Sequence, residues 1–234
     1  MRTEEYATSL TYLADPKYIG RYLAPGSKET LLERVSLLRS QRRKGHFEWQ
    51  VSIPRESPLT FKENSDRLQA DVTGIIEGEG DEVKEVRTLL RIWSLDEALC
   101  YRAGIDAEQV KSKFAETGQR VMVRFHFERR AKHVTSLEPI YHLQVGGVAL
   151  KNENCWFPKQ LDIPRFHFPP MDIVLLCELV LVNLFHKSSR NLREKPEWKK
   201  LVVKSQDAFQ GSYFSKFYSY VNSTTDTILG NLIS

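Results

Sequence analysis

The sequence predicts an α+β fold in which a mostly antiparallel sheet of five or six strands packs against a central buried helix and C-terminal helices, after an N-terminal helical segment. Segments with apolar residues at every second position fill the middle of the chain, and segments with helical spacing lie before and after them. A stretch at 162–187 joins an extended, proline-rich half to a helix that is apolar on every side. We expect one compact unit, with a helical segment at 1–45 packed on an α+β domain at 46–234.

The composition is that of a globular protein, with 41% hydrophobic and 27% charged residues among 234. Three widely spaced cysteines fit reduced thiols better than a disulfide framework or a zinc site. The N-terminus is acidic and lacks the apolar core of a signal peptide. We therefore expect a cytoplasmic protein without membrane contact. The net charge of +4 is too small for nucleic-acid binding to follow from charge alone.

The N-terminal segment predicts helices. Apolar and aromatic residues within 1–26 favour one or two short helices that pack on the main body. Ser27 is placed to cap a longer helix over 28–44, whose C-terminus is basic and which ends at Gly45. A single apolar stripe runs along this helix: Leu31, Val35 and Leu38.

Alternation of apolar and polar residues predicts the strands. We expect strands over 46–53, 68–76, 86–95, 121–128 and 140–145. The acidic segment 77–82 joins the second strand to the third; its spacing does not match a calcium loop, so a solvated hairpin tip is the favoured interpretation. A short helix is expected over 106–114.

The central stretch is extended over 162–170, where three prolines lack an N–H, and becomes a helix near Met171. The apolar run of this helix is too short to span a bilayer. It contains Glu178, and a carboxylate among apolar side chains needs a partner. The candidates are Arg165, Arg124 and His167.

Two more helices follow a basic connector at 188–196. Apolar positions around Trp198 to Phe209 line the first of them. The last helix is aromatic, with Phe214, Phe217 and Tyr218 among its apolar residues.

Polar residues of two predicted strands converge on one face. Arg124, His126 and Glu128 alternate along one strand, and a hairpin partner brings His142 and Gln144 beside them. Arg165 and His167 alternate in the same way before the central helix. Histidine can exchange a proton near neutral pH and arginine can clamp a phosphate, so the candidate catalytic residues are His126, Glu128, His142, Arg124, His167 and Arg165.

We expect the side chains on this face to be exposed. The face is then a solvated surface, a surface that contacts nucleic acid, or a catalytic or metal site. Basic clusters offer further contacts to nucleic acid or a partner, at Arg42, Arg43, Arg130, Lys132, Arg190 and Arg193. They form either one track for phosphates or three unconnected patches.

The motifs of nucleotide hydrolysis, dinucleotide binding, nucleophile-elbow hydrolysis and zinc binding are missing from the sequence. We therefore expect no cofactor and no metal, and the sequence leaves open whether the protein is an enzyme.

The block from Arg124 to Phe185 resembles a bacterial domain family of unknown function. The matching order is Arg124-Phe125-His126-Phe127-Glu128, a loop, His142-Leu143, Asp162-Ile163-Pro164, and an apolar helix ending Leu181-Val182-Asn183-Leu184-Phe185. Members of that family sit beside helicases in phage-defence loci. The resemblance implies a prokaryotic cytosolic partner protein and supplies no catalytic residue.

Three hypotheses about function follow. The first is a subunit of a bacterial nucleic-acid-processing or phage-defence system that contacts nucleic acid, or a protein partner such as a helicase, through the basic polar face. The second is a metal-independent nuclease in which His126 and His142 are the acid and base pair. The third is a structural interaction module that binds through its aromatic C-terminal helix.

Overall fold

The computed structural model describes residues 3–44, 47–94, 96, 120–129, 141–146 and 166–222. Its helices are α1 (Thr3–Ala14), the 3-10 helix η1 (Ile19–Arg21), α2 (Ser27–Arg43), α5 (Ile173–Leu184), α6 (His186–Arg193) and α7 (Pro196–Val221). Its strands are β1 (Glu48–Ile53), β2 (Leu59–Thr60), β3 (Leu68–Glu79), β4 (Glu82–Ser94), β5 (Arg120–Arg129), β6 (Tyr141–Val145) and β7 (Phe166–His167). None of these helices is long and apolar enough to cross a membrane.

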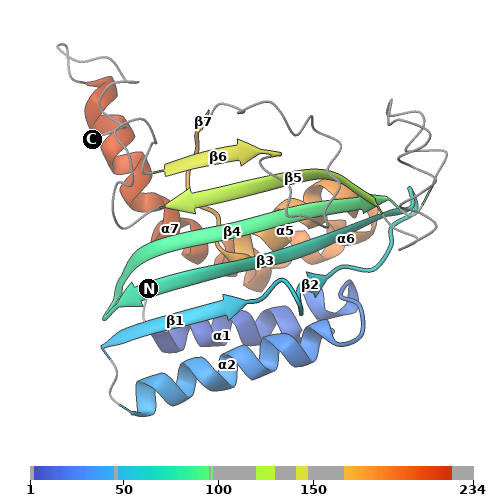
Figure 1. The fold of residues 1–234 in the computed structure, drawn as a ribbon, viewed down its shortest axis with the longest axis horizontal. Coiled ribbons are helices and arrows are strands. Elements are labelled where there is room, and N and C mark those ends of the chain that lie inside the picture. The colour runs from blue at the N-terminus through green and yellow to red at the C-terminus, as the bar shows by residue number, and fades with distance from the viewer. Residues whose placement is uncertain are drawn as a thin grey trace.

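The strands form one antiparallel sheet in the order β1-β3-β4-β5-β6-β7, with β2 also paired to β3 (Figure 1). The predicted α+β class is confirmed. The strands β3 and β4 are longer than predicted, because their ladder continues to a turn at Gly80–Asp81. The acidic segment 77–82 is therefore mostly strand, and Lys84 lies 3.4 Å from Glu79 and 2.7 Å from Glu82.

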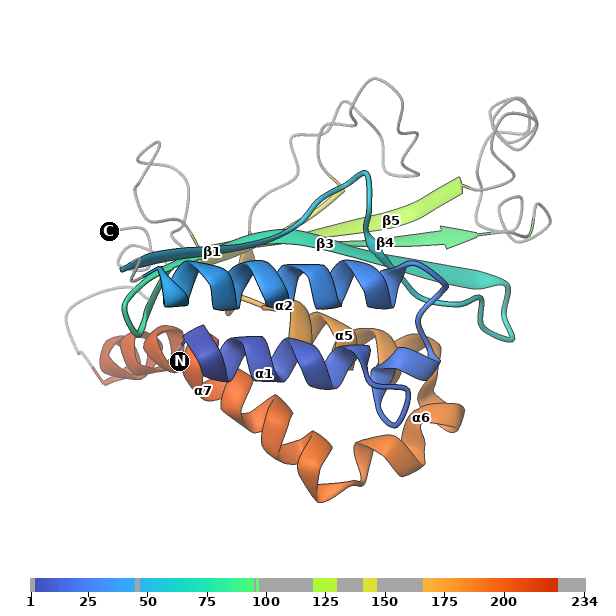
Figure 2. The same cartoon turned by 90° about the horizontal axis from the view of Figure 1, so that it is seen from below.

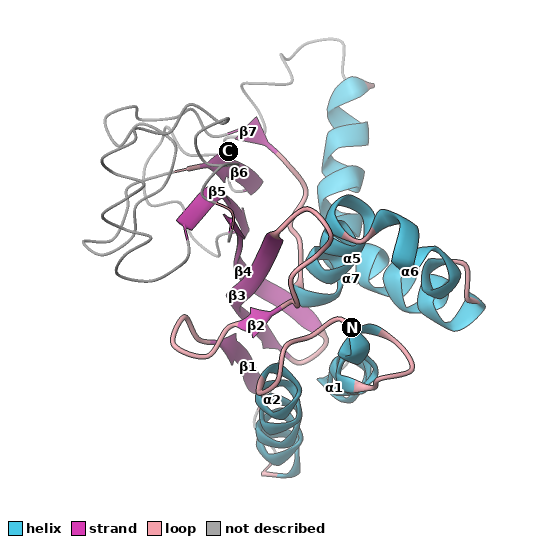
Figure 3. Ribbon diagram, turned by 90° about the vertical axis from the view of Figure 1, so that its right-hand side faces the viewer, coloured by secondary structure: helices cyan, strands magenta, loops and turns pink. Residues whose placement is uncertain are grey.

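The helices all lie on one side of the sheet (Figures 2 and 3). The face toward them carries the apolar residues of each strand, for example Trp49, Val51 and Ile53 of β1, and these join one hydrophobic core with α1, α2, α5 and α7. Helix α2 lies along β1, where the Gln41 side chain accepts a hydrogen bond from the Gln50 backbone N–H. We call the opposite side of the sheet the polar face.

Helix α5 is the central helix, although its bounds and environment differ from the prediction. Asp172 caps it, because its side chain accepts a hydrogen bond from the Leu175 N–H at 2.9 Å, so the helix begins at Ile173. It is not covered on every side, since Asn183 is exposed. Glu178 is partly buried, and its partners are Arg193 of α6 and Trp198 of α7. Of the partners proposed from the sequence, Arg124 is therefore wrong, whereas Arg165 and the side chain of His167 lie outside the described part of the structure.

The N-terminal segment forms the expected helices. The stripe of Leu31, Val35 and Leu38 is buried as predicted. The capping role of Ser27 is wrong, because Ser27 is itself the first helical residue and Gly26 precedes it. The Ser27 hydroxyl instead accepts a hydrogen bond from the Thr60 N–H at 2.9 Å, which joins α2 to β2.

The C-terminal region is one helix over Pro196–Val221 where the sequence predicts two. Gly211 lies within it and does not interrupt it. Trp198 and Phe209 are buried as predicted, whereas Phe214 and Tyr218 are exposed. The helix expected over 106–114 lies outside the described residues.

Candidate functional site

The polar face carries one cross-strand row of ionisable residues and a neighbouring row that contains His126. The register places Arg87 of β4 opposite Glu128, Glu128 opposite His142, and His142 opposite His167 of β7. A neighbouring row places His126 opposite Gln144. The predicted arrangement of the strand 121–128 and its hairpin partner is therefore confirmed.

The side chains of this face are more buried than the sequence predicts. Arg124 and His142 are each 1% exposed, and Nε2 of His142 lies 3.5 Å from a carboxylate oxygen of Glu128. Glu128 and His126 are partly exposed. The interpretation of this face as a fully solvated surface is therefore wrong, because Arg124 and His142 are buried. His142 lies beside Glu128 and can help to position its carboxylate.

A second cluster, which the sequence analysis missed, lies beside Arg124. The register places Asp71 opposite Arg91 and Arg91 opposite Arg124. Asp71 accepts hydrogen bonds from Trp93 Nε1 at 2.6 Å and Thr60 Oγ1 at 2.7 Å, and it lies 3.3 Å from Arg91. Extending the alternation of β5 to β3 and β4 would have revealed Asp71 and Arg91, because both occupy polar positions between apolar ones.

A pocket of about 460 Å³ opens on the polar face. One wall is the connection from β1 to β2 (residues 54–58), which rises from the sheet on the side away from the helices (Figures 2 and 3). The floor is formed by strands β3, β4 and β5. The ionisable residues that line it are Arg55, Glu56, Arg87, His126 and Glu128. We call this cavity the polar-face pocket.

The two arginines of the polar-face pocket differ in their partners. Arg55 is exposed and makes no hydrogen bond or ion pair with any residue that the structure describes. The Arg87 side chain is 48% exposed, and its Nε lies 2.5 Å from Glu85 of the same strand. Both guanidinium groups are accessible to a ligand from solvent. Arg55 can bind it directly, whereas Arg87 must share its guanidinium group with Glu85.

Several predicted site residues do not reach this pocket. His142 and Arg124 lie on the polar face but are buried and do not line it. His167 pairs with His142 at the edge strand β7. Arg165, Arg130 and Lys132 lie outside the described residues.

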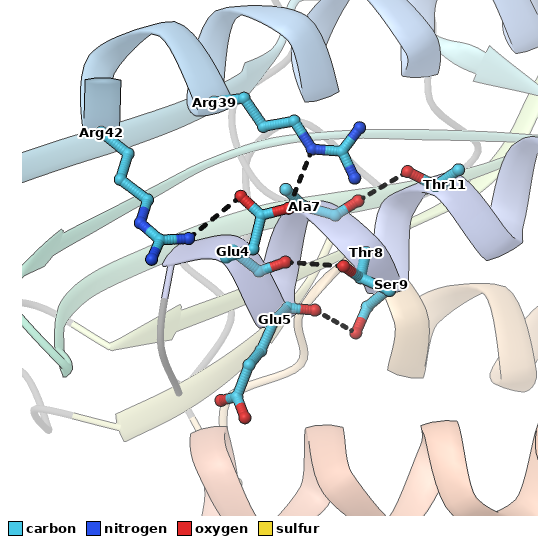
Figure 4. A network of polar contacts seen from close by, with 8 residues as sticks. All are labelled: Glu4, Glu5, Ala7, Thr8, Ser9, Thr11, Arg39 and Arg42. Carbon is cyan, nitrogen blue, oxygen red and sulfur yellow. Dashed lines mark hydrogen bonds and ion pairs between the residues drawn. The ribbon is translucent and has the colours of Figure 1, made fainter. Parts of the chain in front are cut away.

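Four arginines of the basic clusters on the helical layer take part in ion pairs. Arg39 and Arg42 of α2 both contact the Glu4 carboxylate of α1, at 3.1 and 3.2 Å (Figure 4). Arg190 lies 3.0 Å from Glu194, and Arg193 lies 2.8 Å from Glu178.

The two clusters of the helical layer are also far apart. The C-terminal end of α2, with Arg42 and Arg43, and the helix α6 lie at opposite ends of the layer (Figures 1 and 2). They do not join the polar face, which is the other side of the sheet. In the described part of the chain, one continuous track of these clusters is thus not formed.

Among the described residues, no three His, Cys, Asp or Glu side chains converge as metal ligands would. No family model matches the chain, and neither a curated protein nor a solved structure matches it. The polar face is therefore interpreted from its own geometry.

Proposed function

We propose that the chain binds nucleic acid through the polar-face pocket, where Arg55 and Arg87 contact phosphate oxygens beside His126. The observation that carries this proposal is the presence of two solvent-accessible guanidinium groups and an imidazole around one cavity. Guanidinium groups match phosphate geometry with paired N–H donors.

Burial of His142 favours binding over cleavage by the expected acid and base pair. A general acid and a general base must both reach the substrate, directly or through one water molecule. His142 is 1% exposed and contacts Glu128, so it supports Glu128 and does not face a ligand. The setting in a bacterial nucleic-acid-processing or phage-defence system, with a helicase as partner, follows from the resemblance of the Arg124–Phe185 block alone.

Binding of labelled single- and double-stranded oligonucleotides to the wild type and to Arg55→Gln and Arg87→Gln variants tests the proposal. Each variant removes a charge-assisted hydrogen bond, so affinity should fall about ten- to hundredfold. Because the pocket contacts few phosphates, the plot of log affinity against log salt concentration should have a shallow slope. On a single strand, each contacted phosphate contributes about 0.7 to that slope. Incubating the same oligonucleotides with the protein, with and without EDTA, checks for cleavage.

Arg190→Gln is the matched control, because Arg190 is exposed on the helical layer and has the same side chain. It should bind as the wild type does. If Arg190→Gln weakens binding and Arg55→Gln does not, the interface lies on the helical layer and the pocket proposal is wrong. Absence of binding at low salt would exclude nucleic acid as the ligand.

A further inference from the structure

The polar-face pocket has carboxylates as well as cations. Glu56 follows Arg55 in the wall, and Glu128 shares the floor with Arg87 and His126. Glu56 makes no hydrogen bond or ion pair with a described residue, whereas a carboxylate oxygen of Glu128 lies 3.5 Å from His142 Nε2. The pocket therefore presents a cationic part and an anionic part to the same ligand.

This mixture disfavours the interior of a nucleic-acid strand. A strand that passes through the pocket brings successive phosphates past Glu56 and Glu128, and like charges at short range repel. Among the described lining residues, the basic ones are Arg55, Arg87 and His126, while Arg42 of α2 and Arg190 of α6 form ion pairs on the other side of the sheet. A ligand with a single compact anionic group avoids this repulsion.

The carboxylates do suit hydrogen-bond donors. Ionised Glu56 and Glu128 are acceptors only, so they recognise hydroxyl or amino groups. A nucleotide carries such groups on its sugar and base, beside its phosphate. The volume of about 460 Å³ lies within the range of small-molecule sites, which span roughly 300 to 1,000 Å³.

We infer that the polar-face pocket binds a phosphomonoester of a nucleotide, with the phosphate on Arg55 and Arg87 and the sugar or base donors on Glu56 and Glu128. The phosphomonoester is either the phosphorylated end of a strand or a free nucleotide. This inference rests on the proposed function in one respect, the binding of phosphate by Arg55 and Arg87, and it restricts the ligand to one that carries a terminal phosphate.

A binding series on one oligonucleotide sequence tests the inference. The forms are a 5′-phosphorylated strand, a 3′-phosphorylated strand, a strand with hydroxyl groups at both ends, and the circularised strand. At least one of the phosphorylated strands should bind at least about tenfold more tightly than the hydroxyl and circular forms, because those two forms lack a phosphomonoester. Adenosine 5′-monophosphate, titrated alone by calorimetry, reports on the free nucleotide.

Variants of the pocket residues test whether the preference for a phosphorylated end arises in the polar-face pocket. Arg55→Gln changes an exposed loop residue and should remove the preference for the phosphorylated end without changing thermal stability. Glu56→Gln should weaken binding of the nucleotide far less than Arg55→Gln, and Arg190→Gln should leave the preference intact.

The outcomes separate the inference from the proposed function. Equal binding of circular and phosphorylated strands overturns the inference and leaves nucleic-acid binding standing. Binding of the mononucleotide without binding of any strand supports the inference with a free nucleotide as the source, and overturns the proposed function. If neither the strands nor the mononucleotide bind, both are overturned.

Discussion

Glu178 of α5 joins the two helices that follow it, α6 and α7, and α6 occupies most of the stretch predicted as a basic connector. Its two carboxylate oxygens lie 2.8 Å from Arg193 Nε and 2.7 Å from Trp198 Nε1. Trp198 is 1% exposed, so its indole N–H depends on this acceptor, whereas the Arg193 side chain is 28% exposed and can turn to water. The tryptophan is therefore the more sensitive partner.

Replacement of Glu178 by alanine should destabilise the protein by about 1 to 3 kcal/mol, because it leaves the buried Trp198 N–H without an acceptor. Glu178→Gln should cost less, since an amide oxygen can still accept that hydrogen bond. Chemical denaturation of the two variants gives both free energies of unfolding.

Glu194→Ala is the control for this pair of variants. Glu194 also pairs with an arginine, at 3.0 Å, but both side chains are mostly exposed. Its loss should change stability by less than about 1 kcal/mol. Equal effects of Glu178→Ala and Glu194→Ala would show that the Trp198 hydrogen bond contributes nothing.

Two glycines test how tightly the elements are packed. A Cβ at Gly78, beside the bulge of β3, would lie 2.2 Å from the Trp49 ring and 2.7 Å from the Glu82 backbone oxygen. A Cβ at Gly211 of α7 would meet nothing within 4 Å. The same substitution therefore has opposite expected effects at the two positions.

Gly78→Ala should destabilise by about 1 to 3 kcal/mol, since Trp49 is buried and must move. Gly211→Ala should stabilise by about 0.5 to 1 kcal/mol, because alanine is favoured over glycine within a helix. Thermal unfolding of both variants against the wild type measures the two shifts. A stable Gly78→Ala variant would contradict the close packing of Trp49 on β3.

The alternation of apolar and polar residues predicts which face of the sheet a side chain occupies, because successive residues of a strand point to opposite faces. The alternation in β5 and β6 correctly gives the face of Arg124, His126, Glu128 and His142, because neighbouring strands share their faces. Lengths and ends depend on tertiary contacts. Ser27 has the residue type and position of a helix cap, yet its hydroxyl accepts a hydrogen bond from the Thr60 N–H of β2. This contact joins segments that are far apart in the sequence, so the local pattern does not predict it.

At the scale of the molecule, the order of helices and strands predicts the α+β class because each class of fold has its own succession of elements. The succession does not tell which side of the sheet each helix covers. The basic residues of α2 and α6 are thus recognisable as clusters, while their separation from the polar face follows only from the layers (Figure 3). Burial of His142 and Arg124 likewise depends on packing that alternation does not contain.

Three helices meet at a buried polar cluster in the core. Asp172 caps α5 and is 0% exposed, and the hydroxyl groups of Tyr6 from α1 and Ser205 from α7 face its carboxyl. Burial raises the pKa of Asp172 from its ordinary 3.8 to about 6, although the nearby Ser205 hydroxyl and the backbone N–H of Leu175 oppose the shift. Tyr6 and Cys177 are the other titratable groups near it, and their pKa values are raised further above neutrality.

Stability should therefore depend on pH through Asp172. Between pH 3.8 and 6 the folded protein holds a proton that the unfolded chain has released, so folding is favoured as the pH falls through this window. The contribution is complete below 3.8 and is lost as the pH rises through about 6, a change of about 3 kcal/mol. Tyr6 and Cys177 stay neutral throughout the window.

The variant Asp172→Asn tests this dependence, because it keeps the oxygen that caps α5 and removes the group that binds the proton. Denaturation at several pH values should show that the wild type becomes more stable relative to Asp172→Asn by about 2 kcal/mol between pH 7 and pH 4. A constant difference between the two proteins would mean that the Asp172 carboxylate is ionised in the core at both pH values.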